Sequence, residues 1–107
     1  MLYLTNSFSI NMLTRTSHTV TFTPSTEEKA RILLSQGGFI SAVGHAETAG
    51  LLENMLGLPV PANRVNITLQ DGDVVVVAQY TGPRLPEGAT SLPEGARIEF
   101  WLVEIAS

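Results

Sequence analysis

The chain has 107 residues, of which 44% are hydrophobic and 15% charged, so it can build a core as one domain spanning residues 1–107. The same composition excludes a disordered tail, which would carry fewer apolar residues and more charge. The net charge of −4, with six Lys and Arg in all, argues against sequence-indifferent binding to long DNA or RNA, because such binding needs many cationic contacts. A small anionic ligand held by one or two arginines is still compatible with this charge.

The chain contains no cysteine, so it has no disulfide and no thiolate metal site. We expect neither a metal nor another cofactor. The first residues lack the basic start and the long apolar run of a signal peptide, and no stretch is long enough to cross a membrane. These observations predict a cytoplasmic protein without a membrane partner.

The first strand is predicted over Leu2–Thr5, which is short, apolar and β-prone, and a loop follows that enters a short helix near Ser9. Asn6, Ser9 and Asn11 then form a cluster of hydrogen-bonding groups at the carboxyl end of a strand. Ligands usually bind at that end in open α/β sheets. Ordinary capping by serine and asparagine is the alternative explanation.

The next strand is predicted over His18–Thr23, where Val20 and Phe22 alternate with threonines, as in a half-buried strand near a sheet edge. His18, at the start of this strand, is expected to be exposed. A helix follows that ends near Gln36, and its start is predicted from a capping box formed by Ser25 and Glu28.

The central stretch, Ile40–Leu52, is the most informative part of the chain. A short apolar run ends at Gly44, and His45 follows in the first turn of a predicted helix that ends at Gly57. Gly44 lets a ligand approach the backbone closely, and the unpaired N–H groups of a helix start suit a phosphate. An imidazole at this place can donate or accept a proton. Alternatively, His45 caps the helix or packs against the sheet.

A hairpin is predicted next, because Val65–Leu69 alternates with polar residues and Asp71-Gly72 is a two-residue turn signal. Val74–Ala78 is apolar without alternation, which indicates a central strand covered on both faces. A final strand is predicted over Ile98–Ile105. Together these elements predict an α/β domain with a mixed, five-stranded sheet flanked by helices.

Three segments carry a family resemblance when they are taken together. They are LYLTNSFSINML at residues 2–13, ISAVGHAETAGLL at residues 40–52, and the block that runs from Arg64-Val65-Asn66-Ile67 to Arg84-Leu85-Pro86-Glu87-Gly88. In this order and spacing, the chain resembles the viral type III anti-CRISPR ring nucleases from about Leu2 to Ile105. The resemblance implies a cytoplasmic, metal-independent phosphodiesterase, in the host cytoplasm if the protein is viral. Such an enzyme opens cyclic tetra-adenylate, the messenger with which type III CRISPR systems activate defence nucleases, and binds it across a two-fold homodimer.

The resemblance also assigns residues. The catalytic histidine of the family corresponds to His45, its Arg-Leu-x-Glu-Gly loop supplies Arg84 and Glu87, and its polar N-terminal cluster corresponds to Asn6, Ser9 and Asn11. One departure is visible: longer viral relatives carry a helix before the last strand, where this chain has only Ala89–Gly95.

The chemistry of an RNA ring suits these residues. A ribose 2′-hydroxyl in line with the adjacent phosphate can attack it, giving a 2′,3′-cyclic phosphate and a 5′-hydroxyl. His45 can protonate the leaving 5′ oxygen, and Arg84 can bind phosphate oxygens bidentately. Glu87 is expected to position Arg84. Two alternatives stay open: a non-catalytic module that binds or sequesters cyclic oligoadenylate, and an interaction protein that pairs through an exposed sheet edge.

Overall fold

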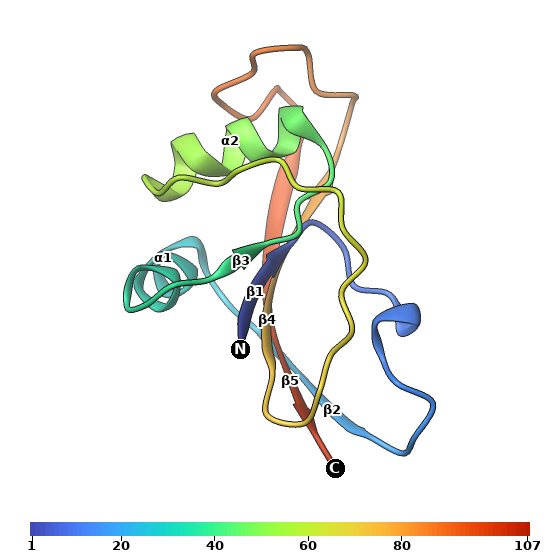
Figure 1. Cartoon of the computed structure of the whole chain (residues 1–107). Coiled ribbons are helices and arrows are strands. Elements are labelled where there is room, and N and C mark those ends of the chain that lie inside the picture. Colours follow the sequence, from blue (N-terminus) through green and yellow to red (C-terminus); the bar gives the residue numbers. More distant parts are fainter.

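The computed structural model describes residues 1–107 and consists of one mixed sheet with two α-helices. The strands are β1 (Leu2–Thr5), β2 (Thr19–Pro24), β3 (Ile40–Ser41), β4 (Val74–Thr81) and β5 (Arg97–Ala106). The helices are α1 (Glu27–Ser35), α2 (Ala46–Leu56) and the 3₁₀ turn η1 (Ile10–Met12). The five strands follow the order β2-β5-β4-β1-β3 (Figure 1). Strand β1 is parallel to both of its neighbours, β3 and β4, and strand β5 is antiparallel to both of its neighbours, β4 and β2. This confirms the predicted mixed α/β sheet of five strands.

Strand β4 is the middle strand of the sheet, and its side chains enter the core on both faces. Val76 and Ala78 belong to the cluster under the helices, whereas Val75 and Val77 belong to the cluster on the opposite face. The apolar run without alternation therefore predicted this strand correctly.

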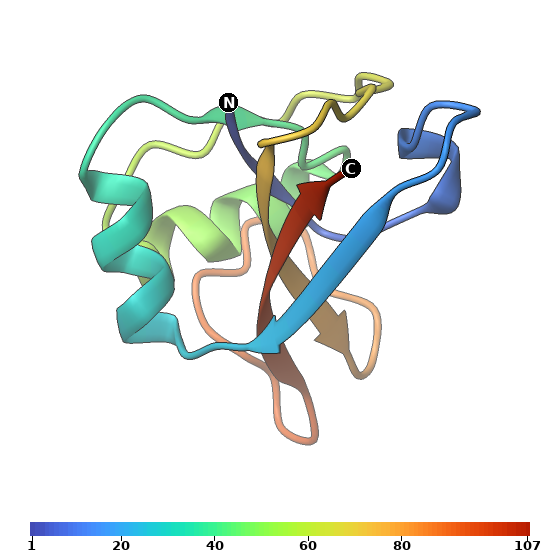
Figure 2. The same ribbon diagram turned by 90° about the horizontal axis from the view of Figure 1, so that it is seen from below.

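The two faces of the sheet are covered differently, as Figure 2 shows. Helices α1 and α2 pack on one face over a cluster of 11 buried residues. The other face has a cluster of 5 buried residues, over which lie half-buried side chains of the irregular segments on that side. These side chains are Phe8, Met12, Leu13 and Ile67. The second face is consequently the less completely buried one.

The predicted hairpin is wrong in its first arm. Val65–Leu69 is not a strand, and Leu69 makes only an isolated parallel bridge to Leu13. Strand β4 already has β1 and β5 as its two neighbours, so it has no free edge for another arm. The turn at Asp71-Gly72 does form and leads into β4, and the fifth strand of the sheet is β3 instead.

Two local predictions are corrected as well. The cap of α1 is Thr26, whose Oγ1 accepts a hydrogen bond from the Lys29 N–H at 3.1 Å. Ser25 lies one residue before the cap, and its N–H, which Glu28 would bind in the predicted capping box, pairs instead with the Phe100 carbonyl at 2.8 Å. The side chain of His18 is 7% exposed and not open to solvent, because the loop before β2 closes around it.

Helix α2 is fixed at its carboxyl end. Gly57 ends it in the left-handed conformation, with φ of 68°, as the sequence predicted. Arg31 of α1 donates hydrogen bonds to the carbonyls of Leu56 and Met55, at 3.2 and 3.0 Å, and pairs with Glu27 at 2.8 Å. This contact joins the two helices. Neither α-helix is long and apolar enough to span a membrane.

Candidate functional site

The site lies where the parallel strands β1, β3 and β4 finish, because their carboxyl ends meet at one edge of the sheet (Figure 1). Asn6 follows β1, Gly44 and His45 follow β3, and Arg84 follows β4. Candidate groups from three distant parts of the sequence are therefore presented at the same edge.

His45 is the N-cap residue of α2 and has an extended backbone, with φ of −116° and ψ of 124°. Its carbonyl accepts the hydrogen bond from Ala49 N–H at 2.9 Å, but its imidazole makes no capping hydrogen bond. The residue is exposed. Helix capping therefore does not explain this side chain, and the imidazole is available to a ligand.

His45 and Arg84 line the same hollow, which has a volume of about 460 Å³. The full lining is His45, Glu47, Thr48, Tyr80, Gly82, Arg84 and Leu85. Arg84 makes no ion pair or side-chain hydrogen bond, so its guanidinium is a free cation in a hollow whose one acidic member is Glu47. The hollow therefore combines a proton-transferring group, a cation and a helix start, which suits a phosphate.

The loop that carries Arg84 is held against the sheet and against α2. A Cβ at Gly82 would lie 2.7 Å from Ala96 Cα, so the two ends of the loop approach too closely for any side chain. Leu85 is buried, and the Asn54 side chain of α2 donates a hydrogen bond to the Thr90 carbonyl. Arg84 and the helix that begins after His45 are thus parts of one packed unit.

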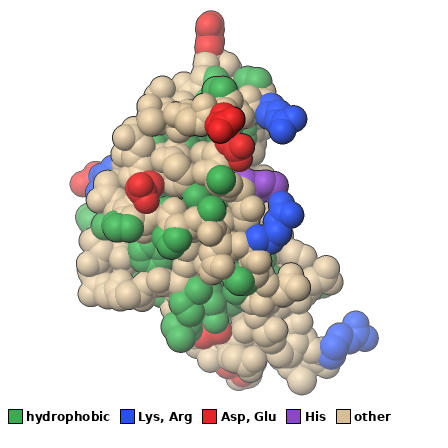
Figure 3. All heavy atoms as spheres, turned by 45° about the horizontal axis from the view of Figure 1, so that its top comes forward, with side chains coloured by type: hydrophobic (Ala, Val, Ile, Leu, Met, Phe, Trp, Pro, Cys, Tyr) green, Lys and Arg blue, Asp and Glu red, His purple; other side chains and the backbone are tan.

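Two further side chains, those of Asn6 and Arg64, lie beside Gly44. The Gly44 N–H donates to Asn6 Oδ1 at 3.4 Å, and a Cβ built on Gly44 would lie 3.7 Å from Arg64 Nε. Arg64 makes no ion pair, and it is the one Lys or Arg between Arg31 and Arg84. The sequence analysis gave Arg64 no role. The sequence feature that could have indicated one is its position as the single charged residue of the connector at 58–70. In the space-filling view, basic side chains lie on either side of the visible histidine (Figure 3).

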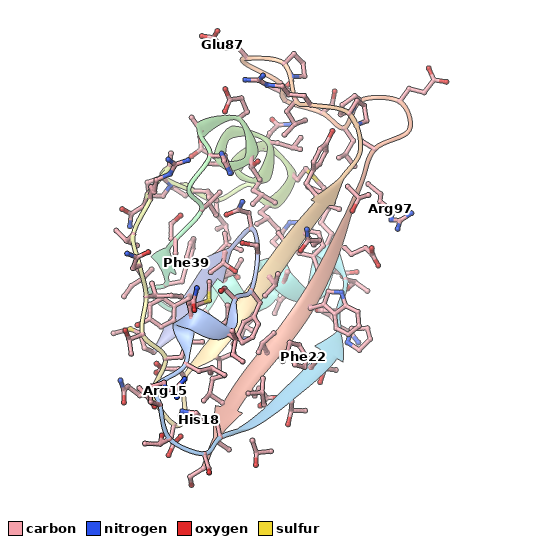
Figure 4. All side chains as sticks on the ribbon, turned by 90° about the vertical axis from the view of Figure 1, so that its right-hand side faces the viewer. Arg15, His18, Phe22, Phe39, Glu87 and Arg97 are labelled. Carbon is pink, nitrogen blue, oxygen red and sulfur yellow. The ribbon has the colours of Figure 1, made fainter.

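The remaining candidates lie apart from this hollow. Glu87 lines a neighbouring hollow of about 190 Å³ over the first turns of α2, projects from the tip of its loop (Figure 4), and makes no ion pair with Arg84. Ser9 Oγ accepts a hydrogen bond from the Asn11 N–H at 3.2 Å and so caps η1. Asn11 lines a third hollow together with His18. The structure thus brings together Asn6, Gly44, His45 and Arg84, but not Ser9, Asn11 or Glu87.

The donor set gives no metal centre, since no group of three or more His, Cys, Asp or Glu residues is placed to hold an ion. The groups in or beside this hollow are nitrogen donors: the imidazole of His45 and the guanidinium of Arg84 line it, the N–H groups at the start of α2 follow His45, and Arg64 lies beside Gly44. This arrangement can bind phosphate oxygens and transfer a proton to a leaving oxygen.

Comparisons with known proteins relate this chain to a group of viral proteins. The chain is 34% identical over 111 residues to uncharacterized protein 26 of Sulfolobus islandicus filamentous virus, covering 100% of this chain and 93% of that protein. It is 28% identical over 112 residues to uncharacterized protein ORF116 of Acidianus filamentous virus 1, covering 98% and 96%. These relatives support the expectation of a viral protein.

The fold has a solved counterpart in the same group. The structure of B116 of Sulfolobus turreted icosahedral virus superimposes with a TM-score of 0.79 at 32% sequence identity, covering 96% of this chain and 97% of that one. The model of the family described as STIV B116-like matches residues 2–102. The chain therefore belongs to the STIV B116-like family.

Proposed function

We propose that this protein is a metal-independent ring nuclease that cleaves cyclic tetra-adenylate to linear di-adenylate with a 2′,3′-cyclic phosphate, and so switches off type III CRISPR signalling in the host cytoplasm. The observation that supports it most is the shared hollow of His45 and Arg84 at the start of α2. The sequence resemblance supplies the identity of the ring.

In the proposed reaction, the ribose 2′ oxygen forms a bond to phosphorus and the bond from phosphorus to the 5′ oxygen breaks. The 2′-hydroxyl releases its proton to water, and His45 supplies a proton to the departing 5′ oxygen. Arg84 and Arg64 stabilise the charge on the phosphoryl oxygens. Orientation of the ribose is the other large contribution, because the nucleophile belongs to the substrate.

His45 acts as the acid through its imidazolium form. The anionic groups that face it are the phosphates of the bound ring and Glu47, which lines the same hollow.

The size of the hollow supports a site shared by two subunits. A volume of about 460 Å³ is in the range that encloses one drug-sized ligand, so a ring of four nucleotides extends beyond it. A two-fold homodimer places one His45 and one Arg84 on each side of a two-fold symmetric ring. Ser9 and Asn11, which lie outside the hollow of their own subunit, are then available to the other half of the ring.

The less buried face of the sheet is our candidate for the dimer contact. Phe8 and Phe22 stack edge to face at 5.5 Å and, with Trp101, line an apolar hollow of about 390 Å³. Phe22 is 51% exposed. Light scattering should give the mass of two chains for the wild type and of one chain for Phe22→Asp. The matched control is Ile32→Asp on α1, since Ile32 is 50% exposed on the helix side and its replacement should leave the dimer intact.

A non-catalytic module that sequesters cyclic oligoadenylate is the second candidate. The exposed His45 favours it, because no hydrogen bond orients the imidazole for proton transfer. Incubation with cyclic tri-, tetra- and hexa-adenylate in EDTA, with excess ring and chromatography of the products, separates the two. Repeated turnover of the tetra-adenylate ring supports the nuclease, whereas tight binding of an intact ring supports the module.

A further inference from the structure

His18 is a buried histidine that the proposed mechanism does not use. Its side chain is 7% exposed at the start of β2. The Nδ1 atom is buried and makes no hydrogen bond, but it lies 3.4 Å from Oδ1 of Asp71. Since buried polar atoms are rarely left without a partner, Asp71 is the group that compensates this nitrogen.

The other ring nitrogen faces hydroxyl groups. Nε2 lies 2.8 Å from Thr14 Oγ1 and 3.3 Å from Thr16 Oγ1, and these two oxygens are 2.9 Å apart. An ionised carboxylate only accepts hydrogen bonds, so the proton of a neutral His18 belongs on Nδ1. Nε2 then accepts a hydrogen bond from the Thr14 hydroxyl. The surroundings therefore select the Nδ1–H tautomer.

Asp71 belongs to a turn that is fixed to the rest of the sheet. The Gly72 N–H donates to the Ile105 carbonyl at 2.7 Å, and the Ile105 N–H donates to the Asp73 carbonyl at 3.1 Å. The Gln70 N–H donates to Asp73 Oδ2 at 2.8 Å and closes the turn. His18 is therefore held against a rigid support.

The contact between His18 and Asp71 holds one end of the segment from Asn6 to His18. Apart from η1 it has no regular structure. Its polar contacts with the rest of the chain are at Asn6, at Met12, whose carbonyl accepts from the Leu69 N–H at 2.7 Å, and at His18, and Phe8 adds an apolar contact with Phe22. Asn11 and His18 line one hollow of about 630 Å³. Figure 4 shows His18 beside Arg15 at the end of the molecule opposite Glu87, far from the loop of Arg84.

We propose that His18 is a positioning residue: held as the Nδ1–H tautomer between Thr14 and Asp71, it sets the position of the segment that presents Asn6, Ser9 and Asn11. The inference rests on the proposed function for the identity of the ligand. It predicts an effect on ring binding and none on bond breaking, because His45 and Arg84 are carried by other elements.

The first test needs no ligand. Long-range ¹H–¹⁵N NMR of the imidazole should show the Nδ1–H tautomer in the wild type. Exchange of the Asn11, Met12 and Leu13 amides, which are hydrogen-bonded within this segment, should be faster in His18→Gln. The matched control is His18→Asn, whose side-chain nitrogen takes the place of Nδ1 toward Asp71 and should keep the exchange slower than in His18→Gln. An averaged tautomer, as in a solvent-exposed histidine, or equal exchange in all three proteins would overturn the proposal.

The second test separates binding from cleavage. His18→Gln should weaken cyclic tetra-adenylate binding roughly 2- to 10-fold, the effect of one neutral hydrogen bond, with the single-turnover rate at saturating protein unchanged. Asp71→Ala should do the same, and the double variant should be no weaker than either. Additive losses, or a lower saturating rate with unchanged affinity, would contradict the positioning role. If the wild type binds no ring, the proposed function is overturned, whereas the tautomer and exchange results still decide whether His18 holds the segment.

Discussion

The polar groups at the two ends of the sheet differ in whether they have partners. Where β1, β3 and β4 finish, Arg64 and Arg84 make no ion pair and the imidazole of His45 makes no capping hydrogen bond. At the other end, Asp71 lies against His18, and Asp73 lies 3.2 Å from the Met1 amine and accepts a hydrogen bond from Gln70 N–H at 2.8 Å.

This difference separates groups that hold the fold from groups that are free to bind. A buried carboxylate with partners stabilises the folded state, and its removal leaves those partners unpaired. Exposed cations without partners contribute little to stability but can bind an anionic ligand. Variants at the first end should therefore lose activity without losing stability. At the second end, removal of the Asp73 carboxylate, which is 10% exposed, should lower stability without changing the cleavage rate.

His45→Ala is expected to have the largest effect. Loss of the proton donor should slow single-turnover cleavage by roughly 10²- to 10⁴-fold, while the ring still binds and thermal unfolding is unchanged. Quench-flow with saturating protein and calorimetry measure the two quantities. Cleavage by the variant at nearly the wild-type rate would remove His45 from the mechanism.

Arg84→Ala should weaken binding and cleavage together, by roughly 10- to 100-fold, because a charged hydrogen bond to phosphate is lost. Arg84→Lys is the matched control, which keeps the charge but not the bidentate geometry and should recover part of the loss. Full activity of the alanine variant would show that the loop at 82–88 is a turn without a role in binding or cleavage.

Asp73→Ala tests the opposite end. Its side chain is 10% exposed, and the variant should lower the free energy of unfolding by about 1–3 kcal/mol, because the Gln70 N–H loses its partner. Single-turnover cleavage at a temperature where the variant is folded should stay close to that of the wild type. A stable but inactive variant would show that the two ends are not separated in this way.

Glu87→Gln should have the smallest effect, a change of less than about 3-fold in binding and cleavage, because Glu87 is exposed and pairs with no cation. Isothermal titration and product analysis measure it. A loss as large as that of Arg84→Ala would instead give Glu87 a direct role at the ring.

Sequence patterns predicted the parts of the fold that depend on local chemistry. The apolar run of β4, the turn at Asp71-Gly72 and the helix end at Gly57 each follow from residues whose conformational preference is strong. Strand β3 was missed because its two residues are too short for a periodic pattern. Val65–Leu69 has the alternation of a strand because Ile67 and Leu69 pack against the sheet. The third apolar residue of the pattern, Val65, is 46% exposed and does not continue it.

The candidate site was predictable in part. The start of a predicted helix indicated His45, and the family resemblance indicated Arg84. In the structure both residues follow strands that meet at one edge, and both line one hollow. The contact of Arg64 with Gly44 depends on the path of the connector at 58–70, which crosses back over the sheet edge through the hydrogen bonds of Asn63 to Val43 and Ser41. Such a path depends on tertiary contacts and leaves no periodic signal in the sequence.

The measurement that tests the central claim most directly is the incubation of wild-type protein with excess cyclic tetra-adenylate in EDTA, followed by chromatography and mass analysis of the products. The account predicts repeated turnover to linear di-adenylate bearing a 2′,3′-cyclic phosphate and a 5′-hydroxyl, at a rate unchanged by the chelator. An intact ring after prolonged incubation, or cleavage that appears only after magnesium or manganese is added, would contradict it.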